Sequence, residues 1–594
     1  MPPRVRPTVR YFYPTLVVIG VVMVVAACLP TIVFGRYANV DEAYTSALGE
    51  RLLEGYRLYQ GAISQRGPMM YYAYELLDAL CGWDNVRSVR VAGLIFALAH
   101  LALTWMTGRA LFGEGVAAVA TLICAYALAV GLGAHDGLAL NCEALQVPFA
   151  LGGLLAGALG MRAPRGTARR RLRLAAAGLL YGVAFTVKQT AGLLPLPLLA
   201  WIALDGLRSR ERRRAMIDAS VYAAATAFPV AVFVAHAWAS GTLRALWYYC
   251  VTYNLQIHRE SGYGFAGWVS PLLVLLGTHT AYFFLVAVAA AATAARWSRR
   301  VSLAVRARRG RALLAGLSVE DYVALDAFAA LALAAAFPQH FGHSYLFPLP
   351  MLALTAAAGA RRALPPGRPT AGLRTALAAA TALGVVLSAL ATTAAFGLRG
   401  LVSHSELVFT IAGYIERATS AQDKIFVWGF APWLYGYSHR RPAGRYVFAT
   451  YVTGFVPFFW WDLPSEPARA VPGSLTDLLG DLDRERPALV VDAGSVEIAR
   501  PMRAYPQAAA WLRASYCFES RIGAVDIYRR RGDGDTCPTP YFPCPSTPFD
   551  HWGSPIVAPM PPVVDDGPSG YLGFAFPDQP NGFTPGERPM SCQP

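Results

Sequence analysis

Residues 13–34 read YPTLVVIGVVMVVAACLPTIVF, and the acidic pair Asp41-Glu42 follows a few positions later. About 20 consecutive apolar residues are enough to cross the ~30 Å hydrocarbon core of a bilayer as a helix. The chain is 55% hydrophobic and only 15% charged, whereas a soluble domain carries roughly 25% charged residues. The sequence therefore predicts a polytopic α-helical membrane protein and argues against a soluble enzyme.

Apolar runs recur along the first 400 residues. We count about eleven expected spans: residues 13–34, 89–107, 115–132, 144–161, 174–187, 190–204, 217–238, 268–295, 322–337, 345–360 and 373–396. Arginine clusters separate them at residues 4–10, 162–173, 208–214, 296–311 and 361–374. All of these clusters fall on one side of the expected bundle, which is the cytoplasmic side by the positive-inside rule.

Basic residues in cytoplasmic loops account for the net charge of +15. The charge therefore gives no reason to expect nucleic acid as a partner. The orientation predicts a multi-pass protein of the plasma (inner) membrane with a cytoplasmic N-terminus. The first loop, residues 35–87, and everything after residue 396 then face outward. We expect a transmembrane domain over residues 1–400, with amphipathic helices in that first loop.

Residues 174–204 lie between two basic loops, so they must cross the membrane twice or not at all. Two legs from so short a segment each fall short of the full hydrocarbon core. The tip of this hairpin, at Lys188, is then expected at the outer interface, where a lysine could meet a lipid phosphate. The alternative is that Lys188 only extends its ammonium group to the interface and orients the hairpin.

The C-terminal part has the pattern of a small soluble domain. Short apolar runs at residues 424–428, 488–492 and 524–528 alternate with helical stretches, which predicts an extracytoplasmic α/β domain over residues 401–531. Residues 532–594 contain 15 of the 42 prolines and are expected to form an irregular tail. Disulfides would be permitted there, and the candidates are Cys517, Cys537, Cys544 and Cys592, whose pairing the sequence leaves open.

The first outer loop contains the best candidates for chemistry. Asp41 and Glu42 come directly after the first span, so a carboxylate is held at the outer interface, where it could act as a general base. The alternative is an acidic residue that merely stabilises the start of a helix. Arg66, followed by Gly67-Pro68, could bind two phosphate oxygens through its guanidinium fork. Its alternative role is that of a solvated loop charge.

Polar residues from three later loops are expected at the same interface. They are Asp136, Asn141 and Glu143; His258, Arg259 and Glu260; and His340, His343 and Tyr345. Ionisable groups gathered near hydrocarbon tend to line a cavity, although outward loops must be polar in any case. His340 and His343 have no third ligand nearby in sequence, and the nearby carboxylates do not require a metal. We assign no cofactor, and a divalent metal at Asp41, Glu42 and Glu143 stays possible.

The order of these motifs resembles the membrane glycosyltransferases of the C-type fold. The resemblance is to glycosyltransferase family 39 and to bacterial proteins similar to protein O-mannosyltransferases and the lipid A aminoarabinose transferase. It covers most of residues 35–450. The motifs are Asp41-Glu42, Gly55-Tyr-Arg-Leu-Tyr, Arg66-Gly-Pro, Asn141-Cys-Glu143, Gly182-Val-Ala-Phe-Thr-Val-Lys188-Gln-Thr, His343-Ser-Tyr-Leu-Phe-Pro348, Val427-Trp-Gly-Phe and Arg440-Arg-Pro-Ala-Gly-Arg445-Tyr. One departure is Arg66-Gly67-Pro68, where the family commonly has lysine followed by one or two prolines.

The resemblance implies inverting transfer of a hexosyl or pentosyl group from a polyprenyl-phosphate sugar to an acceptor hydroxyl on the outer side of the membrane. The acceptor would be a lipid, glycan or protein of the cell envelope. Asp41 takes the family's general-base position. Arg66 and Lys188 become candidates for the leaving phosphate, and Glu42, Asn141, Glu143, His340, His343 and Tyr345 for substrate binding.

Two other classes of function stay open from the sequence. A transporter or flippase of a lipid-linked substrate shares a polar cavity among helices, but it favours paired broken helices in two related halves. The sequence shows one short hairpin and no second copy. A non-catalytic envelope scaffold is the other alternative, in which the outer domain binds polysaccharide or protein.

Overall fold

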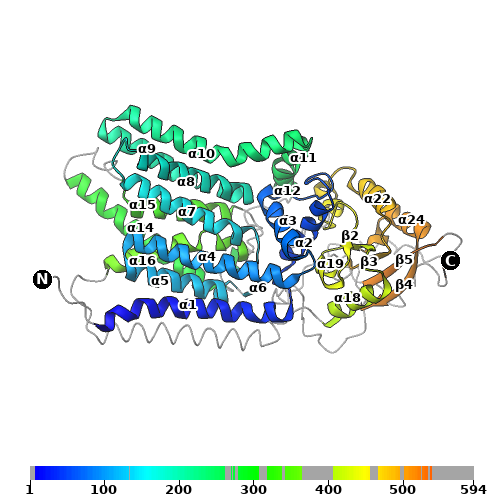
Figure 1. The fold of residues 1–594 in the computed structure, drawn as a ribbon. Coiled ribbons are helices and arrows are strands. Elements are labelled where there is room, and N and C mark those ends of the chain that lie inside the picture. Colours follow the sequence, from blue (N-terminus) through cyan, green and yellow to red (C-terminus); the bar gives the residue numbers. More distant parts are fainter. Residues whose placement is uncertain are drawn as a thin grey trace. The chain divides into compact units, whose positions relative to one another are not determined.

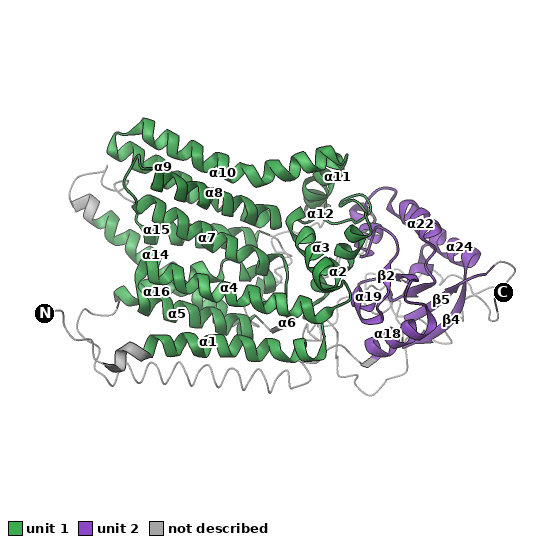
Figure 2. Ribbon diagram, viewed as in Figure 1, with its two compact units in different colours: residues 1–402 green, residues 403–594 purple. Residues whose placement is uncertain are grey.

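The chain forms two compact units, residues 1–402 and residues 403–594 (Figure 2). The computed structural model describes residues 7–132, 134–260, 269, 272–273, 279–306, 317–336, 342–363, 406–454, 466–494, 501–523, 525–532 and 536–537. Each unit is described by itself below.

The secondary-structure elements described in unit 1 are helices (Figure 1). Its elements are α1 (Pro7–Phe34), α2 (Val40–Leu53), α3 (Pro68–Cys81), α4 (Val86–Phe112), α5 (Glu114–Tyr126), η1 (Ala127–Gly131), α6 (Ala134–Gly137), α7 (Cys142–Arg162), α8 (Ala168–Val187), η2 (Gln189–Ala191), α9 (Pro195–Ser209), α10 (Arg212–Ala239), α11 (Leu243–Trp247), η3 (Tyr248–Tyr253), α12 (Asn254–Glu260), α14 (Thr280–Arg306), α15 (Val319–Ala335), η5 (Gly342–Leu346) and α16 (Leu349–Ala363).

Within the described residues, six helical segments are long and apolar enough to cross a membrane. They are Phe12–Phe34, Val86–Phe112, Glu114–Gly131, Cys142–Arg162, Gln189–Ser209 and Arg212–Ala239. The expected span at residues 174–187 is helical as part of α8, whose first turns carry several arginines. The expected span at residues 373–396 lies outside the described residues. The count of about eleven spans therefore stays a prediction.

Helices α7, α8 and α10 run alongside one another, with α8 packed against both α7 and α10 (Figure 1). Gly178 and Gly182, one helical turn apart on α8, face the backbone of α10. A Cβ atom would lie 2.4 Å from the carbonyl oxygen of Tyr222 at the first glycine and 2.3 Å from that of Thr226 at the second. Small residues at this spacing let two helix backbones approach closely, which is a main source of helix association in a bilayer.

The break that the sequence predicts at Lys188 is present. Helix α8 ends at Val187, Lys188 has an extended backbone conformation, and the chain returns through η2 into α9. Pro195 occupies the first turn of α9, where the missing N–H of proline costs no hydrogen bond. Lys188 thus lies at the tip of a helical hairpin.

Unit 2 contains a five-stranded sheet with the strand order β2-β1-β3-β5-β4. Strand β1 pairs in parallel with β2 and with β3, whereas β5 pairs antiparallel with β3 and β4. The elements are α18 (Glu406–Ala418), β1 (Lys424–Trp428), α19 (Trp433–Ser438), β2 (Arg441–Pro442), α20 (Thr450–Thr453), α21 (Glu466–Arg469), α22 (Ser474–Glu485), β3 (Leu489–Asp492), η7 (Met502–Ala504), α24 (Pro506–Ser515), β4 (Tyr516–Ile522) and β5 (Val525–Arg530).

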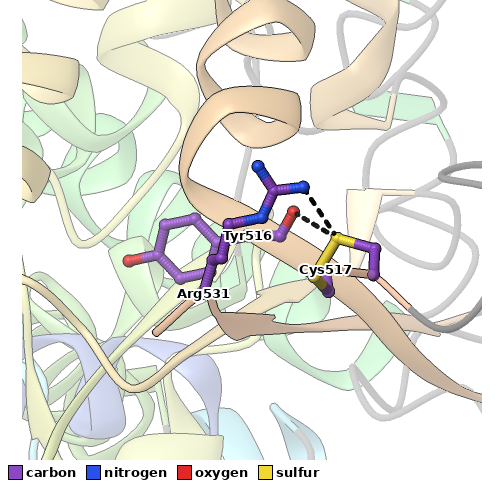
Figure 3. Close-up of a disulfide and its surroundings, with 4 residues drawn as sticks. Tyr516, Cys517 and Arg531 are labelled. Atoms are coloured by element: carbon purple, nitrogen blue, oxygen red, sulfur yellow. Dashed lines mark hydrogen bonds between the residues drawn. A yellow bond between two sulfur atoms is a disulfide. The ribbon is translucent and has the colours of Figure 1, made fainter. Parts of the chain in front are cut away.

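A disulfide joins Cys517 on β4 to Cys537, with 5.3 Å between the two Cα atoms. Figure 3 shows Arg531 and Tyr516 beside it. The guanidinium of Arg531 donates a hydrogen bond to the sulfur of Cys537 over 3.3 Å. The link holds the chain after β5 against the sheet edge formed by β4. The other two candidate cysteines, at positions 544 and 592, lie outside the described residues, as do residues 538–594 as a whole.

Candidate active site

Asp41 and Arg66 form an ion pair in the first loop. Asp41 lies in the first turn of α2, which begins after Asn39 caps the helix by accepting a hydrogen bond from the backbone N–H of Glu42. Nη2 of Arg66 lies 2.8 Å from Oδ1 of Asp41, and both side chains are mostly buried. The other oxygen of Asp41, Oδ2, accepts no hydrogen bond from any described residue. One edge of the carboxylate is therefore fixed while the other stays open.

The path of the backbone after Arg66 explains why glycine and proline occupy positions 67 and 68. A Cβ atom at Gly67 would lie 2.1 Å from the carbonyl oxygen of Thr186 on α8, so only glycine fits where the loop crosses that helix end. Pro68 then starts α3 in a position that needs no N–H donor. Nη1 of Arg66 is buried and has no hydrogen-bond partner among the described residues. This donor is available to an oxygen of a bound molecule.

Lys188 and Glu143 form a second pair next to the first. The ammonium group of Lys188 donates to Oε1 of Glu143, which lies in the first turn of α7. Gln146 holds the two helices together, because its side-chain amide donates to the backbone carbonyls of Ala184 over 2.9 Å and Lys188 over 2.7 Å. Lys188 is one-fifth exposed, whereas Glu143 is almost fully buried.

His343, in η5, lies between two carboxylates. Its Nε2 is 3.9 Å from Oδ2 of Asp41, too long for a hydrogen bond. Its Nδ1 is 3.4 Å from Oδ1 of Asp136, within reach of a long hydrogen bond. The sequence identified Asp136 as a polar loop residue without giving it a role. No local pattern links Asp136 to His343, because 207 positions separate them.

The electrostatic environment keeps these groups ionised. Burial alone would raise the pKa of the Asp41 carboxyl, but the positive charges of Arg66 and His343 outweigh it and hold that pKa below its usual value. Burial would lower the pKa of His343, but Glu143, Asp136 and Asp41 outweigh it and raise that pKa. The site thus favours a carboxylate at Asp41 and an imidazolium at His343.

Glu42 has a different environment from its neighbour Asp41. It is fully buried, and its carboxylate accepts from the guanidinium of Arg90 on α4. It also accepts from the backbone N–H groups of Leu140 and Ala38, each over 2.6 Å. These contacts bind the start of α2 to α4 and to the loop before α7. Sequence analysis assigned no role to Arg90, although it is the one arginine in the expected span at residues 89–107, and a charge inside an apolar span is a recognisable signal.

The remaining candidates for substrate binding differ in their surroundings. Asn141 caps α7 by accepting a hydrogen bond from the backbone N–H of Ala144 over 2.9 Å. Tyr345 is buried, with its ring edge-on to those of Tyr282 and Phe283. His340 lies outside the described residues, as do the side chains of residues 258–260. Among the described residues, no three His, Cys, Asp or Glu side chains are arranged to hold a metal ion.

A buried carboxyl on α3, that of Asp78, differs from all of these because neither of its oxygens has a hydrogen-bond partner among the described residues. Burial, reinforced by the negative charges of Glu50 and Asp84, raises its pKa from the usual 3.8 to about 9. The folded protein therefore holds a proton that the unfolded chain releases above about pH 4. Stability contributed by this group falls as the pH rises from about 4 to about 9.

We predict that Asp78→Asn, which keeps the shape of the neutral carboxyl, raises Tm at pH 8 by about 2–4 °C. The two proteins should converge near pH 4, where the unfolded chain also binds the proton. Thermal unfolding in detergent at pH 4, 6 and 8 measures both effects. A variant that is less stable than the wild type at pH 8 would show that Asp78 is charged and paired in the folded protein.

Part of the sequence that contains these residues matches a known protein family. Residues 65–238 match the family described as "Dolichyl-phosphate-mannose-protein mannosyltransferase". This match spans Arg66, Asp136, Glu143 and Lys188. No curated protein matches the sequence.

Two solved structures match most of the chain. ArnT from Cupriavidus metallidurans, bound to undecaprenyl phosphate, is 16% identical, with a TM-score of 0.50 over 86% of this chain and 97% of that one. The oligosaccharyltransferase AglB from Archaeoglobus fulgidus, in complex with an inhibitory peptide and a dolichol-phosphate, is 12% identical, with a TM-score of 0.47 over 89% of this chain and 75% of that one. Residues 65–238 thus resemble the mannosyltransferase family in sequence, and the chain shares the fold of ArnT.

Proposed function

We propose that this protein transfers a sugar from a polyprenyl-phosphate donor to an acceptor hydroxyl on the extracytoplasmic side of the plasma membrane, with inversion at the anomeric carbon. The observation that carries the proposal is the Asp41–Arg66 pair. Among the described residues, it combines a carboxylate oxygen that accepts no hydrogen bond with a buried guanidinium N–H that has no partner. A base and an anion-binding donor are thus held side by side, as this reaction requires.

In the proposed reaction the acceptor oxygen bonds to the anomeric carbon as Oδ2 of Asp41 removes the hydroxyl proton. The bond between the anomeric carbon and the phosphate oxygen breaks, and the polyprenyl phosphate leaves with the electron pair. The lowered pKa of Asp41 keeps the base ionised before the acceptor binds. Donors already fixed in place stabilise a developing anion better than water does, because they need not reorganise.

The cations proposed for the leaving phosphate are Arg66 and Lys188. Arg66 presents Nη1, and Lys188 lies at the hairpin tip with its charge held in place by Glu143. Glu42 and Asn141 support the site indirectly, since Glu42 fixes α2 to α4 and Asn141 starts α7. Tyr345 is buried against Tyr282 and Phe283 and follows His343 by two positions, and both Tyr345 and His340 stay substrate-binding candidates on sequence grounds.

The proposed topology has about eleven spans, a cytoplasmic N-terminus and an extracytoplasmic α/β domain at residues 401–531. The disulfide between Cys517 and Cys537 supports this side for unit 2, because disulfides persist in oxidising compartments and are rare in the cytoplasm. The acceptor is proposed to be a lipid, glycan or protein of the cell envelope, which an outward site can reach.

The disulfide gives a direct test of the topology. We predict that in protein from native membranes Cys517 and Cys537 resist alkylation until a reductant is added, and that unreduced digests contain a peptide joining them. Cys81 is exposed and free, so it should be alkylated without reduction and serves as the internal control. Free thiols at both positions in rapidly quenched membranes would contradict an extracytoplasmic unit 2.

A second experiment separates transfer from transport. Purified protein in sealed vesicles is given a polyprenyl-phosphate sugar labelled in the sugar, with extracted envelope material as acceptor on one side only. The proposal predicts labelled acceptor and released polyprenyl phosphate. Movement of intact donor between leaflets without cleavage of the sugar–phosphate bond would favour a flippase instead.

A further inference from the structure

The imidazole of His343 lies in a ring of charges drawn from separate elements. Asp136 from α6 faces Nδ1 at 3.4 Å and Asp41 from α2 faces Nε2 at 3.9 Å. Glu143 from α7 is the third carboxylate whose negative charge raises the pKa of His343. Only 9% of the His343 side chain is exposed, so little water screens these charges.

The backbone next to His343 passes close to the carboxylate of Asp136. Gly342 precedes His343, and a Cβ atom there would lie 2.8 Å from Oδ2 of Asp136 and 3.3 Å from Nε2 of His279. The carboxylate of Asp136 therefore occupies the space that a side chain at position 342 would need. Its short helix, α6, follows the π-helical turn η1, and the backbone carbonyl of Asp136 accepts from the amide of Asn141 over 3.4 Å.

Protonation of His343 adds a positive charge to a group that is rich in carboxylates. Among the described residues, the carboxylates of Asp41, Asp136 and Glu143 lie beside the side chains of Arg66, Lys188 and His343. A neutral His343 would make this group more negative, which would oppose the entry of an anionic phosphate. It would also remove the positive charge that faces Oδ2 of Asp41.

We propose that Asp136 is a positioning residue for the transfer reaction: it holds His343 as an imidazolium against Asp41, so that the base stays ionised and oriented when the anionic donor binds. This inference rests on the proposed function. Asp136 touches no reacting atom in this scheme and acts through His343. The raised pKa of His343 supports it, because that pKa is the expected result of two or more carboxylates around one buried imidazole.

The test is the pH dependence of kcat/KM for the lipid-phosphate donor between pH 5.5 and 9. In the wild type we expect kcat/KM to fall as His343 loses its proton at a pH above its usual titration range. In Asp136→Asn the same fall should begin about one pH unit lower, because one carboxylate that favours the imidazolium is gone. The variant should be near the wild-type value at pH 5.5 and about tenfold below it at pH 8.

Three further variants make the result specific. His343→Gln should be slow at every pH and lack the alkaline fall. Asp78→Asn, a change at an equally buried carboxyl outside the site, should follow the wild-type profile. Gly342→Ala displaces Asp136 without removing its charge and should reproduce the early fall of Asp136→Asn, which covers the case in which Asp136→Asn does not fold.

The outcomes separate this inference from the proposed function. If the folded wild-type protein transfers no sugar from any donor, the proposed function fails. If the wild type transfers sugar but its kcat/KM is flat from pH 5.5 to 9, or Asp136→Asn loses the same factor at every pH, the proposed function stands. The positioning role of Asp136 is then overturned, since a merely structural defect gives no recovery at low pH.

Discussion

Replacing Asp41 by asparagine should reduce the transfer rate by about 10³-fold or more while donor binding persists. The change keeps the shape of the side chain and leaves an oxygen for Nη2 of Arg66. It removes the group that takes the acceptor proton, and general base catalysis contributes about 10²–10⁴-fold. The measurement is kcat for sugar transfer, with donor affinity determined separately on the same preparation.

The control for Asp41→Asn is the same substitution at Asp78, which should leave kcat within about twofold of the wild type. Both carboxyls are buried in the segment between α1 and α4, but only Asp41 lies near cations from three other parts of the chain. Turnover by a folded Asp41→Asn protein at the wild-type rate would eliminate Asp41 as the base and direct attention to Glu143.

Arg66→Ala should lower kcat/KM by about 10²–10³-fold, the usual cost of removing one donor that stabilises a developing anion. Two effects combine here. The phosphate loses the N–H group at Nη1, and Asp41 becomes a buried carboxylate without its closest cation. Arg66→Lys restores a charge but not the fork, so it should recover only part of the activity.

Arg57→Ala is the matched control for this position. Arg57 lies in the same loop, and its exposed guanidinium donates to the backbone carbonyl of Ser240 over 2.9 Å, away from Asp41. It should keep kcat/KM within about twofold of the wild type. If Arg57→Ala and Arg66→Ala lowered kcat/KM equally, the reaction would depend on the positive charge of the loop as a whole and not on the pair between Arg66 and Asp41.

Local features of the site could be predicted from the sequence because they are set by nearby residues. The end of α8 at Lys188 follows from the distance between two basic loops, and the start of α2 beside Asp41 follows from the end of the first apolar run. The apolar runs at residues 424–428 and 488–492 became β1 and β3. Each of these depends on fewer than 35 neighbouring residues.

Pairings between distant residues could not be predicted, because they depend on how helices are rotated and packed against one another. Asp136 meets His343 across 207 positions and Glu42 meets Arg90 across 48. Strand β4 was also missed, because Glu519, Ser520 and Arg521 interrupt its apolar residues at an edge of the sheet, so they form no continuous apolar run. Its place is determined by pairing with β5 and by the disulfide.

The most direct test of the central claim is transfer of radiolabelled sugar from a panel of polyprenyl-phosphate sugars by the purified protein in lipid, with Asp41→Asn alongside. The structure predicts labelled envelope acceptor with at least one donor for the wild type. For Asp41→Asn it predicts donor binding without product. A correctly folded wild-type protein that binds none of the donors and labels no acceptor would contradict a lipid-phosphate glycosyltransferase.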